Sequence, residues 1–125
     1  MQRIYLTTQE IAQYRSQLAD YEAALISLDT IEDCEGDLED AAVSLAIKVG
    51  QKPDRIDWLE GLSKRCRVAI CQEEFQKDLS QEKLATTVAH LLNAGICPKI
   101  LVTPVVIYVM KQGIDEFCQP LSFKL

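Results

Sequence analysis

The chain contains few residues that interrupt regular structure, with only five glycines and four prolines in 125 residues. A fold made of many short strands needs frequent turns rich in these residues, so their scarcity argues against an all-β architecture. The sequence also lacks the run of about 20 apolar residues that a membrane-spanning helix requires. The first ten residues, MQRIYLTTQE, contain no apolar segment of the kind found in secretory signals. These absences together predict a cytoplasmic protein with no membrane partner.

Positive charge is scarce, because 13 lysine and arginine residues face 19 aspartate and glutamate residues, for a net charge of −6. Binding to a nucleic acid backbone needs a basic surface, so we expect no nucleic-acid partner. The proportions of hydrophobic residues (48%) and charged residues (26%) are typical of a globular protein. A chain of this length can bury a sufficient core without metal ions or disulfides. We therefore expect residues 1–125 to form a single helical domain.

The sequence contains none of the familiar catalytic motifs. It has no Gly-x-Ser-x-Gly, His-Glu-x-x-His, P-loop or dinucleotide-binding pattern. The single histidine, His90, falls on the polar face of a predicted helix, where it should face solvent, and no nucleophile lies near it in the sequence. We therefore predict no catalytic residue and no cofactor.

The five cysteines are odd in number and irregularly spaced, which fits reduced thiols in the cytosol. Each is expected to behave as a small buried hydrophobic residue. Cys66 and Cys71 are five residues apart, which is about 140° of rotation on a helix. Because they do not converge on one point, we predict no zinc site.

A basic cluster formed by Lys64, Arg65 and Arg67 surrounds Cys66. Neighbouring cations stabilise a thiolate, so Cys66 is the candidate nucleophile of a cysteine-dependent enzyme or redox sensor. Helical phase, however, places Cys66 in an apolar stripe and directs the three cations elsewhere. We expect the cations to pair with an acidic segment earlier in the chain.

That acidic segment supplies the candidate interaction residues Asp29, Glu32, Asp33, Glu35, Glu39 and Asp40. A calcium loop that started at Asp33 would need glycine at its sixth position and glutamate at its twelfth. This chain has Leu38 and Ser44 at those positions, so the sequence predicts no metal site here. The acidic segment and the basic cluster together form the predicted interaction surface.

Apolar residues recur at steps of three and four from about residue 8 to about residue 30, which predicts one amphipathic helix. Thr7 and Glu10 form a capping-box pattern at its start. Gly36 should end this region, and Asp37 should cap a second helix over about residues 37–49.

The residues from Asp33 to Ala42, followed by Leu45, resemble the helix-to-helix junction of UBA-like three-helix modules. In that family a Gly-Asp pair precedes a short helix with alanine and leucine on its inner face. The resemblance covers about a tenth of the chain, and the Met-Gly-Phe type of loop that carries ubiquitin binding has no counterpart upstream. It therefore implies a shared helix junction and no ubiquitin partner.

Two further helices are predicted in the middle of the chain. Asp54 can cap a third helix that keeps its apolar phase to about residue 72, where it either bends or gives way to a new short helix. Ser80 can cap a fourth helix, which Gly95 ends.

The most apolar segment runs from Ile100 to Cys118. Residues 100–109 have strand propensity, but only residues 3–6 offer a second strand, and an isolated pair is marginal. The sequence therefore favours a buried helix over about residues 104–112, with Thr103 as its cap, a break at Gly113, and an end to regular structure at Pro120. We expect an all-α fold, a compact orthogonal bundle of five to six helices with the helix from about residue 104 at its centre.

The predicted function is a protein–protein interaction, adaptor or oligomerisation module with no catalysis of its own. The expected partner is another protein or a second copy of the chain, steered by the opposed charge clusters. Chemistry at Cys66 is the alternative. A small-molecule pocket beneath Tyr14, Tyr21 and Tyr108 is a third hypothesis.

Overall fold

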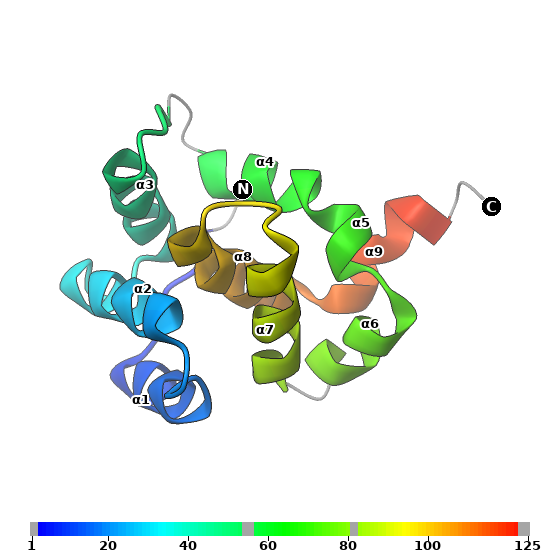
Figure 1. Ribbon diagram of the computed structural model, residues 1–125, viewed down its shortest axis with the longest axis horizontal. Coiled ribbons are helices and arrows are strands. Elements are labelled where there is room, and N and C mark those ends of the chain that lie inside the picture. Colours follow the sequence, from blue (N-terminus) through cyan, green and yellow to red (C-terminus); the bar gives the residue numbers. More distant parts are fainter. Residues whose placement is uncertain (1–2, 54–56, 81–82, 123–125) are drawn as a thin grey trace.

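A computed structural model describes residues 3–53, 57–80 and 83–122, and within these residues it contains nine helices (Figure 1). In chain order they are α1 (Thr8–Gln17), α2 (Glu22–Asp33), α3 (Leu38–Lys48), α4 (Trp58–Arg65), α5 (Arg67–Ile70), α6 (Glu73–Ser80), α7 (Leu84–Ala94), α8 (Lys99–Gln112) and α9 (Ile114–Ser122). The sole β pairing in the described residues is a single antiparallel bridge between Tyr5 and Asp37. The all-α prediction is confirmed.

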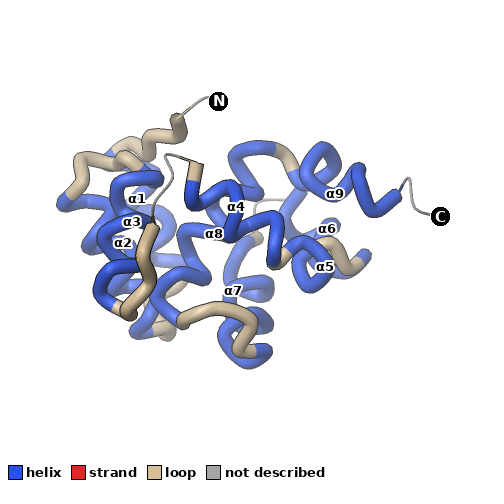
Figure 2. The backbone as a smooth tube through the Cα atoms, turned by 90° about the horizontal axis from the view of Figure 1, so that it is seen from above, coloured by secondary structure: helices blue, strands red, loops and turns tan. Residues whose placement is uncertain are grey.

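Helix α8 occupies the middle of the fold, as the apolar run predicted (Figure 1). Every residue from Leu101 to Val109 is buried, and the helix packs against α2, α3, α4, α7 and α9. Figure 2 shows α1, α2 and α3 at one end of the molecule and α5, α6 and α9 at the other, with α7 and α8 between them. One continuous set of buried apolar side chains joins these groups.

The expected number of five to six helices is wrong, because two of the predicted long helices are divided. The predicted helix over residues 8–30 is interrupted between α1 and α2, where Leu18 is completely buried. The apolar repeat continues in phase across this break, so the sequence pattern does not reveal it. The buried face of α2 is set by its packing on α8, and it includes Ala24, Leu28 and Ile31.

The second division falls at Cys66, which ends α4 and precedes α5. The helix expected to run to about residue 72 therefore stops early, and α6 is the new short helix that was one of the two alternatives. The predicted cap Asp54 lies outside the described residues. Ser80 is the last residue of α6 and not the cap of α7, which begins at Leu84.

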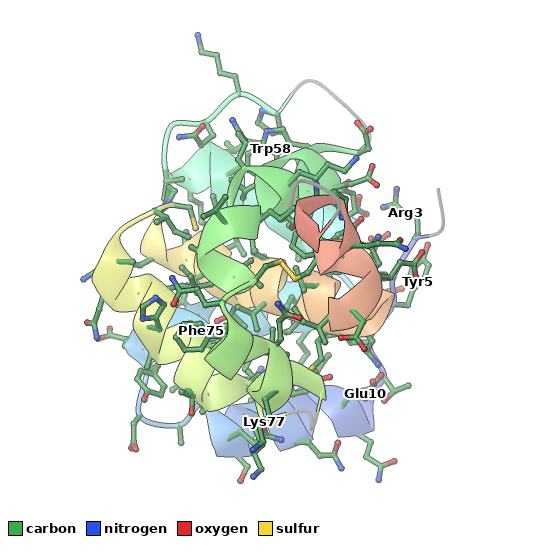
Figure 3. All side chains as sticks on the ribbon, turned by 90° about the vertical axis from the view of Figure 1, so that its right-hand side faces the viewer. Arg3, Tyr5, Glu10, Trp58, Phe75 and Lys77 are labelled. Carbon is green, nitrogen blue, oxygen red and sulfur yellow. A yellow bond between two sulfur atoms is a disulfide. The ribbon has the colours of Figure 1, made fainter. Side chains whose placement is uncertain are left out.

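The C-terminal part also differs from the expectation. Gly113 does break the chain, with φ at +107°, a conformation that side chains disfavour. Pro120 was expected to end regular structure, but it lies inside α9. A disulfide joins Cys71, between α5 and α6, to Cys118 on α9, with 5.6 Å between their Cα atoms (Figure 3). The expectation that all five cysteines are reduced is therefore wrong.

The N-terminal segment is held against the turn between α2 and α3. The N–H of Leu6 donates to the Gly36 carbonyl (2.8 Å), and the N–H of Leu38 donates to the Ile4 carbonyl (3.0 Å). Gly36 has φ at +85°, and a Cβ there would lie 2.1 Å from the Leu6 carbonyl oxygen. Only glycine fits this close approach, and Asp37 caps α3 as predicted.

Helix α1 begins with the predicted capping box. Thr7 accepts a hydrogen bond from the N–H of Glu10, and the Glu10 carboxylate accepts one from the N–H of Thr7. The same carboxylate also pairs with Lys111 near the end of α8. The capping residue therefore also connects the first helix to the central one.

Helix α8 starts five residues earlier than predicted, at Lys99, so Thr103 and Pro104 lie inside it. Proline has no N–H, and within a helix it leaves the carbonyl four residues earlier without its usual donor. That carbonyl belongs to Ile100. The predicted helix start at Pro104 is therefore wrong. The helix tolerates an internal proline because another part of the fold donates a hydrogen bond to the Ile100 carbonyl.

The donor is the hydroxyl of Ser27 on α2. Its Oγ lies 2.5 Å from the Ile100 carbonyl oxygen and 2.9 Å from the Ala23 carbonyl oxygen. Ser27 is itself fully buried at the α2–α8 contact. A hydroxyl 73 residues away in the sequence thus compensates for the hydrogen bond that Pro104 removes.

Ser27→Ala is expected to lower the free energy of unfolding by about 1 to 3 kcal/mol, because the Ile100 carbonyl loses its donor. In a Pro104→Ala background the loss should be smaller, because a backbone N–H at position 104 restores the helical hydrogen bond. Urea denaturation of the four proteins in this double-mutant cycle measures the coupling. Equal losses in both backgrounds would contradict the role assigned to Ser27.

Candidate functional site

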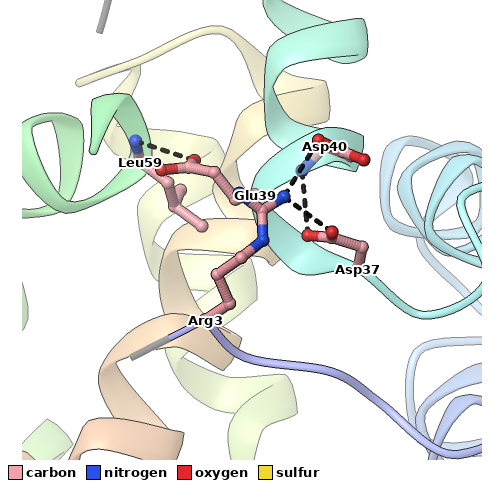
Figure 4. A network of polar contacts seen from close by, with 5 residues as sticks. All are labelled: Arg3, Asp37, Glu39, Asp40 and Leu59. Atoms are coloured by element: carbon pink, nitrogen blue, oxygen red, sulfur yellow. Dashed lines mark hydrogen bonds and ion pairs between the residues drawn. The ribbon is translucent and has the colours of Figure 1, made fainter. Parts of the chain in front are cut away.

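Two arginines that sequence reasoning did not select each pair with two carboxylates of residues 29–40. Arg15 on α1 lies 2.6 Å from a carboxylate oxygen of Asp29 and 2.8 Å from one of Glu32, both on α2. Arg3 lies 2.6 Å from Asp37 and 3.0 Å from Asp40 (Figure 4). Arg3 and Arg15 stand alone in the sequence, so no local pattern indicated their partners.

The basic cluster points elsewhere. Lys64 lies 3.8 Å from a carboxylate oxygen of Glu60, one turn earlier on the same helix. The guanidinium of Arg67 stacks 4.8 Å from the centre of the Phe117 ring on α9. Among the described residues, no ion pair joins Lys64, Arg65 or Arg67 to the acidic segment. The expected pairing between the two clusters is therefore wrong.

Glu39 is the one buried residue among the six acidic residues of the predicted interaction set. Its carboxylate accepts a hydrogen bond from the N–H of Leu59 (3.1 Å) at the start of α4 (Figure 4). Burial raises the pKa of Glu39, and this outweighs the opposing effects of the Leu59 hydrogen bond and of Arg3. Glu39 thus joins α3 to α4 and is not available on the surface, whereas Asp33 and Glu35 are exposed.

A groove of about 520 Å³ lies between the start of α2, the end of α7 and the start of α8. Its apolar lining includes Ile26, Leu92 and Ile100, and its charged lining comprises Asp20, Glu22 and Lys99. Ile26 is 40% exposed, and it is the exposed large aliphatic side chain that lines this groove. The groove therefore offers apolar contact area with charges beside it.

The outer face of α2 continues this surface. Glu22, Ile26, Asp29 and Asp33 follow one another at helical steps of four, three and four residues, and all four are exposed. Residues at such steps share one face of a helix. An exposed isoleucine therefore lies between acidic residues on α2, next to the groove. Two of these acids, Asp29 and Asp33, belong to the predicted interaction set.

A second hollow, of about 210 Å³, is lined by both Cys66 and Cys97. Cys66 is buried, Cys97 is partly exposed, and their thiols are hydrogen bonded to each other. That hydrogen bond and the charge of Arg65 lower the pKa of the Cys66 thiol, against the opposing effect of burial. The sequence identified Cys66 but not Cys97, because the two lie 31 residues apart with no motif between them.

A third hollow, of about 310 Å³, is polar and lies beside Tyr108. Arg3, Glu60, Lys111 and Glu116 line it together with the tyrosine. Burial raises the pKa of Tyr108 to about 12, and the nearby charge and hydrogen bond of Glu60 act in the same direction. Tyr14, Tyr21 and Tyr108 do not line one common pocket: Tyr21 lines the groove and Tyr108 this hollow.

His90 is not solvent-facing as the sequence predicted. It is half-buried, and its ring centre lies 4.3 Å from that of Phe75 on α6. The ring contact helps α6 pack on α7. His90 is partly covered by α6, a helix whose position the sequence pattern did not indicate, while Lys83 and Thr86 on the same face are exposed.

Within residues 3–53, 57–80 and 83–122, no group of three or more His, Cys, Asp or Glu side chains is arranged to hold a metal ion. No helix in those residues has the length and apolar character needed to cross a bilayer. Comparison of the chain with protein-family models, with curated proteins and with solved structures finds no match. Function must therefore be inferred from the surfaces described above.

Glu39→Ala is expected to lower the free energy of unfolding by about 1 to 3 kcal/mol, because the Leu59 N–H loses its acceptor. Glu39→Gln keeps an oxygen acceptor and removes the ionisation. The raised pKa means that wild-type stability falls as the pH rises from the unfolded value of 4.5 through the folded value. Thermal unfolding as a function of pH should show a smaller fall for Glu39→Gln, and parallel curves would contradict the buried carboxylate.

Tyr108 should be detectable by its late ionisation. Because its folded pKa of about 12 exceeds the ordinary tyrosine value of 10.0, its contribution to stability is complete below pH 10 and is lost as the pH rises toward 12. Ultraviolet absorbance of phenolate should show a component near pH 12 in the wild type that Tyr108→Phe lacks. The assignment fails if both proteins give the same titration curve.

Proposed function

We propose that this protein is a protein-interaction module whose docking surface is the groove between α2, α7 and α8. The observation that carries the proposal is the partly exposed Ile26, which lines a groove of about 520 Å³ next to an acidic helix face. In interfaces where a helix binds in a groove, apolar anchor residues are buried in the groove and polar or charged residues surround them. The sequence has no Gly-x-Ser-x-Gly, His-Glu-x-x-His, P-loop or dinucleotide-binding pattern, which favours binding over catalysis.

The charges of this surface favour a basic partner. Glu22 and Asp33 lie on the exposed face of α2 together with Asp29, which is paired with Arg15. Asp20 lies at the N-terminal end of this helix, and Lys99 is the single basic residue among those described that line the groove. The whole chain carries a net charge of −6. Complementary charge speeds association and selects among partners. We therefore propose that the occupant is a helical segment of another protein, with an apolar side chain flanked by lysine or arginine.

The proposal keeps part of the predicted interaction set. Asp29, Glu32, Asp33 and Glu35 lie on or next to the exposed face of α2 and remain candidates. Glu39 is left out because it is buried, and Asp40 because it belongs to α3, which contributes no residue to the groove. Lys64 and Arg65 lie on α4 and Arg67 lies on α5, so these three residues are not part of this surface.

Adaptor function is proposed ahead of self-association, because a second copy of an acidic surface would be repelled. Cytoplasmic location and the absence of a nucleic-acid partner also remain proposals, and the Cys71–Cys118 disulfide does not fix the compartment. The alternative function, chemistry at Cys66, rests on a separate observation, its contact with Cys97, and concerns a different hollow.

A fluorescein-labelled amphipathic peptide of leucine and lysine serves as the probe, and its leucine–glutamate counterpart is the charge control. Fluorescence anisotropy should show binding of the basic peptide to the wild type, weakening as salt rises. Ile26→Glu should weaken binding by roughly tenfold or more, which corresponds to about 1.4 kcal/mol. Light scattering on the same samples detects any self-association.

Val68→Glu is the matched control, because Val68 is 72% exposed on α5, away from the groove. It should bind like the wild type, and both variants should unfold at the wild-type temperature. Equal binding of the acidic and basic peptides would contradict the proposal, as would equal losses for Ile26→Glu and Val68→Glu. A stable dimer disrupted by Ile26→Glu would replace the adaptor with an oligomerisation module.

A further inference from the structure

Cys66 and Cys97 meet where three helical elements approach one another. Cys66 occupies the non-helical junction between α4 and α5, with φ at −94° and ψ at 4°. Cys97 lies in the connection between α7 and α8, immediately before Pro98, which precedes α8. Neither thiol is therefore inside a helical turn, and the two are in hydrogen-bond contact.

The hollow beside the pair makes it reachable by a small molecule. Cys66 is only 4% exposed, yet both cysteines line the same space of about 210 Å³. Arg65 is the single charged residue among those described that line it, and Trp58 also contributes to its wall. A water-sized reagent fits such a space, whereas a folded protein partner does not.

We propose that Cys66 and Cys97 form an oxidisable dithiol that a hydroperoxide converts to a Cys66–Cys97 disulfide. This site is independent of the groove at Ile26, and it is distinct from the disulfide between Cys71 and Cys118. The proposed reagent is a hydroperoxide. The second thiol, Cys97, was not indicated by the basic cluster around Cys66.

With hydrogen peroxide the reaction proceeds in two balanced steps, and an organic hydroperoxide would release its alcohol in place of the first water. The Cys66 thiolate attacks one peroxide oxygen, the O–O bond breaks, and the products are Cys66 sulfenic acid and, after proton uptake, water. The Cys97 sulfur then attacks the sulfenic sulfur, the S–S bond forms, and the departing hydroxide takes the Cys97 proton as a second water. Two thiols lose two electrons and two protons, and the peroxide is reduced to two waters. Two molecules of a small thiol reverse the change by thiol–disulfide exchange, releasing their own disulfide.

Cys66 is the sulfur that reacts first. The thiolate is the nucleophilic form of cysteine, and Cys97 donates a hydrogen bond that stabilises it on Cys66. The positive charge of Arg65 acts in the same direction. Lys64 lies close in sequence but pairs with Glu60, so it provides a control for charge alone.

The test treats the folded protein with hydrogen peroxide, blocks the remaining thiols with N-ethylmaleimide, and maps the tryptic peptides by mass spectrometry. The wild type has three free cysteines and should keep one, Cys34, while a Cys66–Cys97 crosslink appears. Cys34→Ser should form the same crosslink. If Cys34 oxidises while Cys66 and Cys97 stay reduced, the proposal is overturned.

Single substitutions separate the two roles. In Cys97→Ser, dimedone should trap a sulfenic acid at Cys66, whereas Cys66→Ser should give no adduct at Cys97. Arg65→Gln should slow the oxidation several-fold, and Lys64→Gln should leave it unchanged. Trapping at Cys97 but not at Cys66 would overturn the assigned order, and equal rates for the two charge variants would remove Arg65 from the site.

Trp58 provides a second readout in the unlabelled protein, because it is the only tryptophan and it lines the same hollow. A nearby disulfide quenches indole fluorescence, so emission should fall on oxidation of the wild type and recover with dithiothreitol. Cys97→Ser should show neither change. An equal fall in the wild type and in Cys97→Ser would exclude the disulfide as its cause.

Discussion

The burial of α8 is the constraint on which the rest of this structure depends. Nine consecutive residues of this helix are buried, so other elements must cover it on all sides. A helix that is apolar around its whole circumference needs surrounding partners. Helices α2, α3, α4, α7 and α9 provide this cover, and each presents an apolar side to it. The polar groups of α8 are restricted in the same way, which is why the carbonyl freed by Pro104 finds its donor in Ser27.

The sequence predicts those features that local chemistry decides. The capping box at Thr7, the turn at Gly36 and Asp37, and the end of α7 at Gly95 each depend on residues within a few positions of one another. The apolar run likewise indicates a central helix by composition alone. These features are right because neighbouring residues determine the backbone there whatever the rest of the chain does.

Features that depend on distant partners could not be read in this way. The break between α1 and α2 is invisible because the apolar repeat stays in phase across it, and packing against α8 selects another face of α2. Proline inside α8 looks like a helix start until Ser27 is known to lie beside it. Arg3 and Arg15 each lie more than ten residues from the carboxylates that they pair with. Cys66 is likewise far in sequence from its partner Cys97. Candidate sites here are products of the tertiary fold.

The disulfide between Cys71 and Cys118 has a topological consequence. It closes a loop with a sequence separation of 47 that contains α6, α7 and the buried α8. Closing a loop of this size restricts the unfolded chain by about 4 kcal/mol in the chain-entropy description. The restriction applies to the chain between Cys71 and Cys118, whereas α1 to α4 lie outside the loop and are held by non-covalent packing on one another and on α8. Cys97 lies inside this loop and Cys66 outside it. A bond between them would therefore close a second covalent ring that shares residues 71–97 with the first.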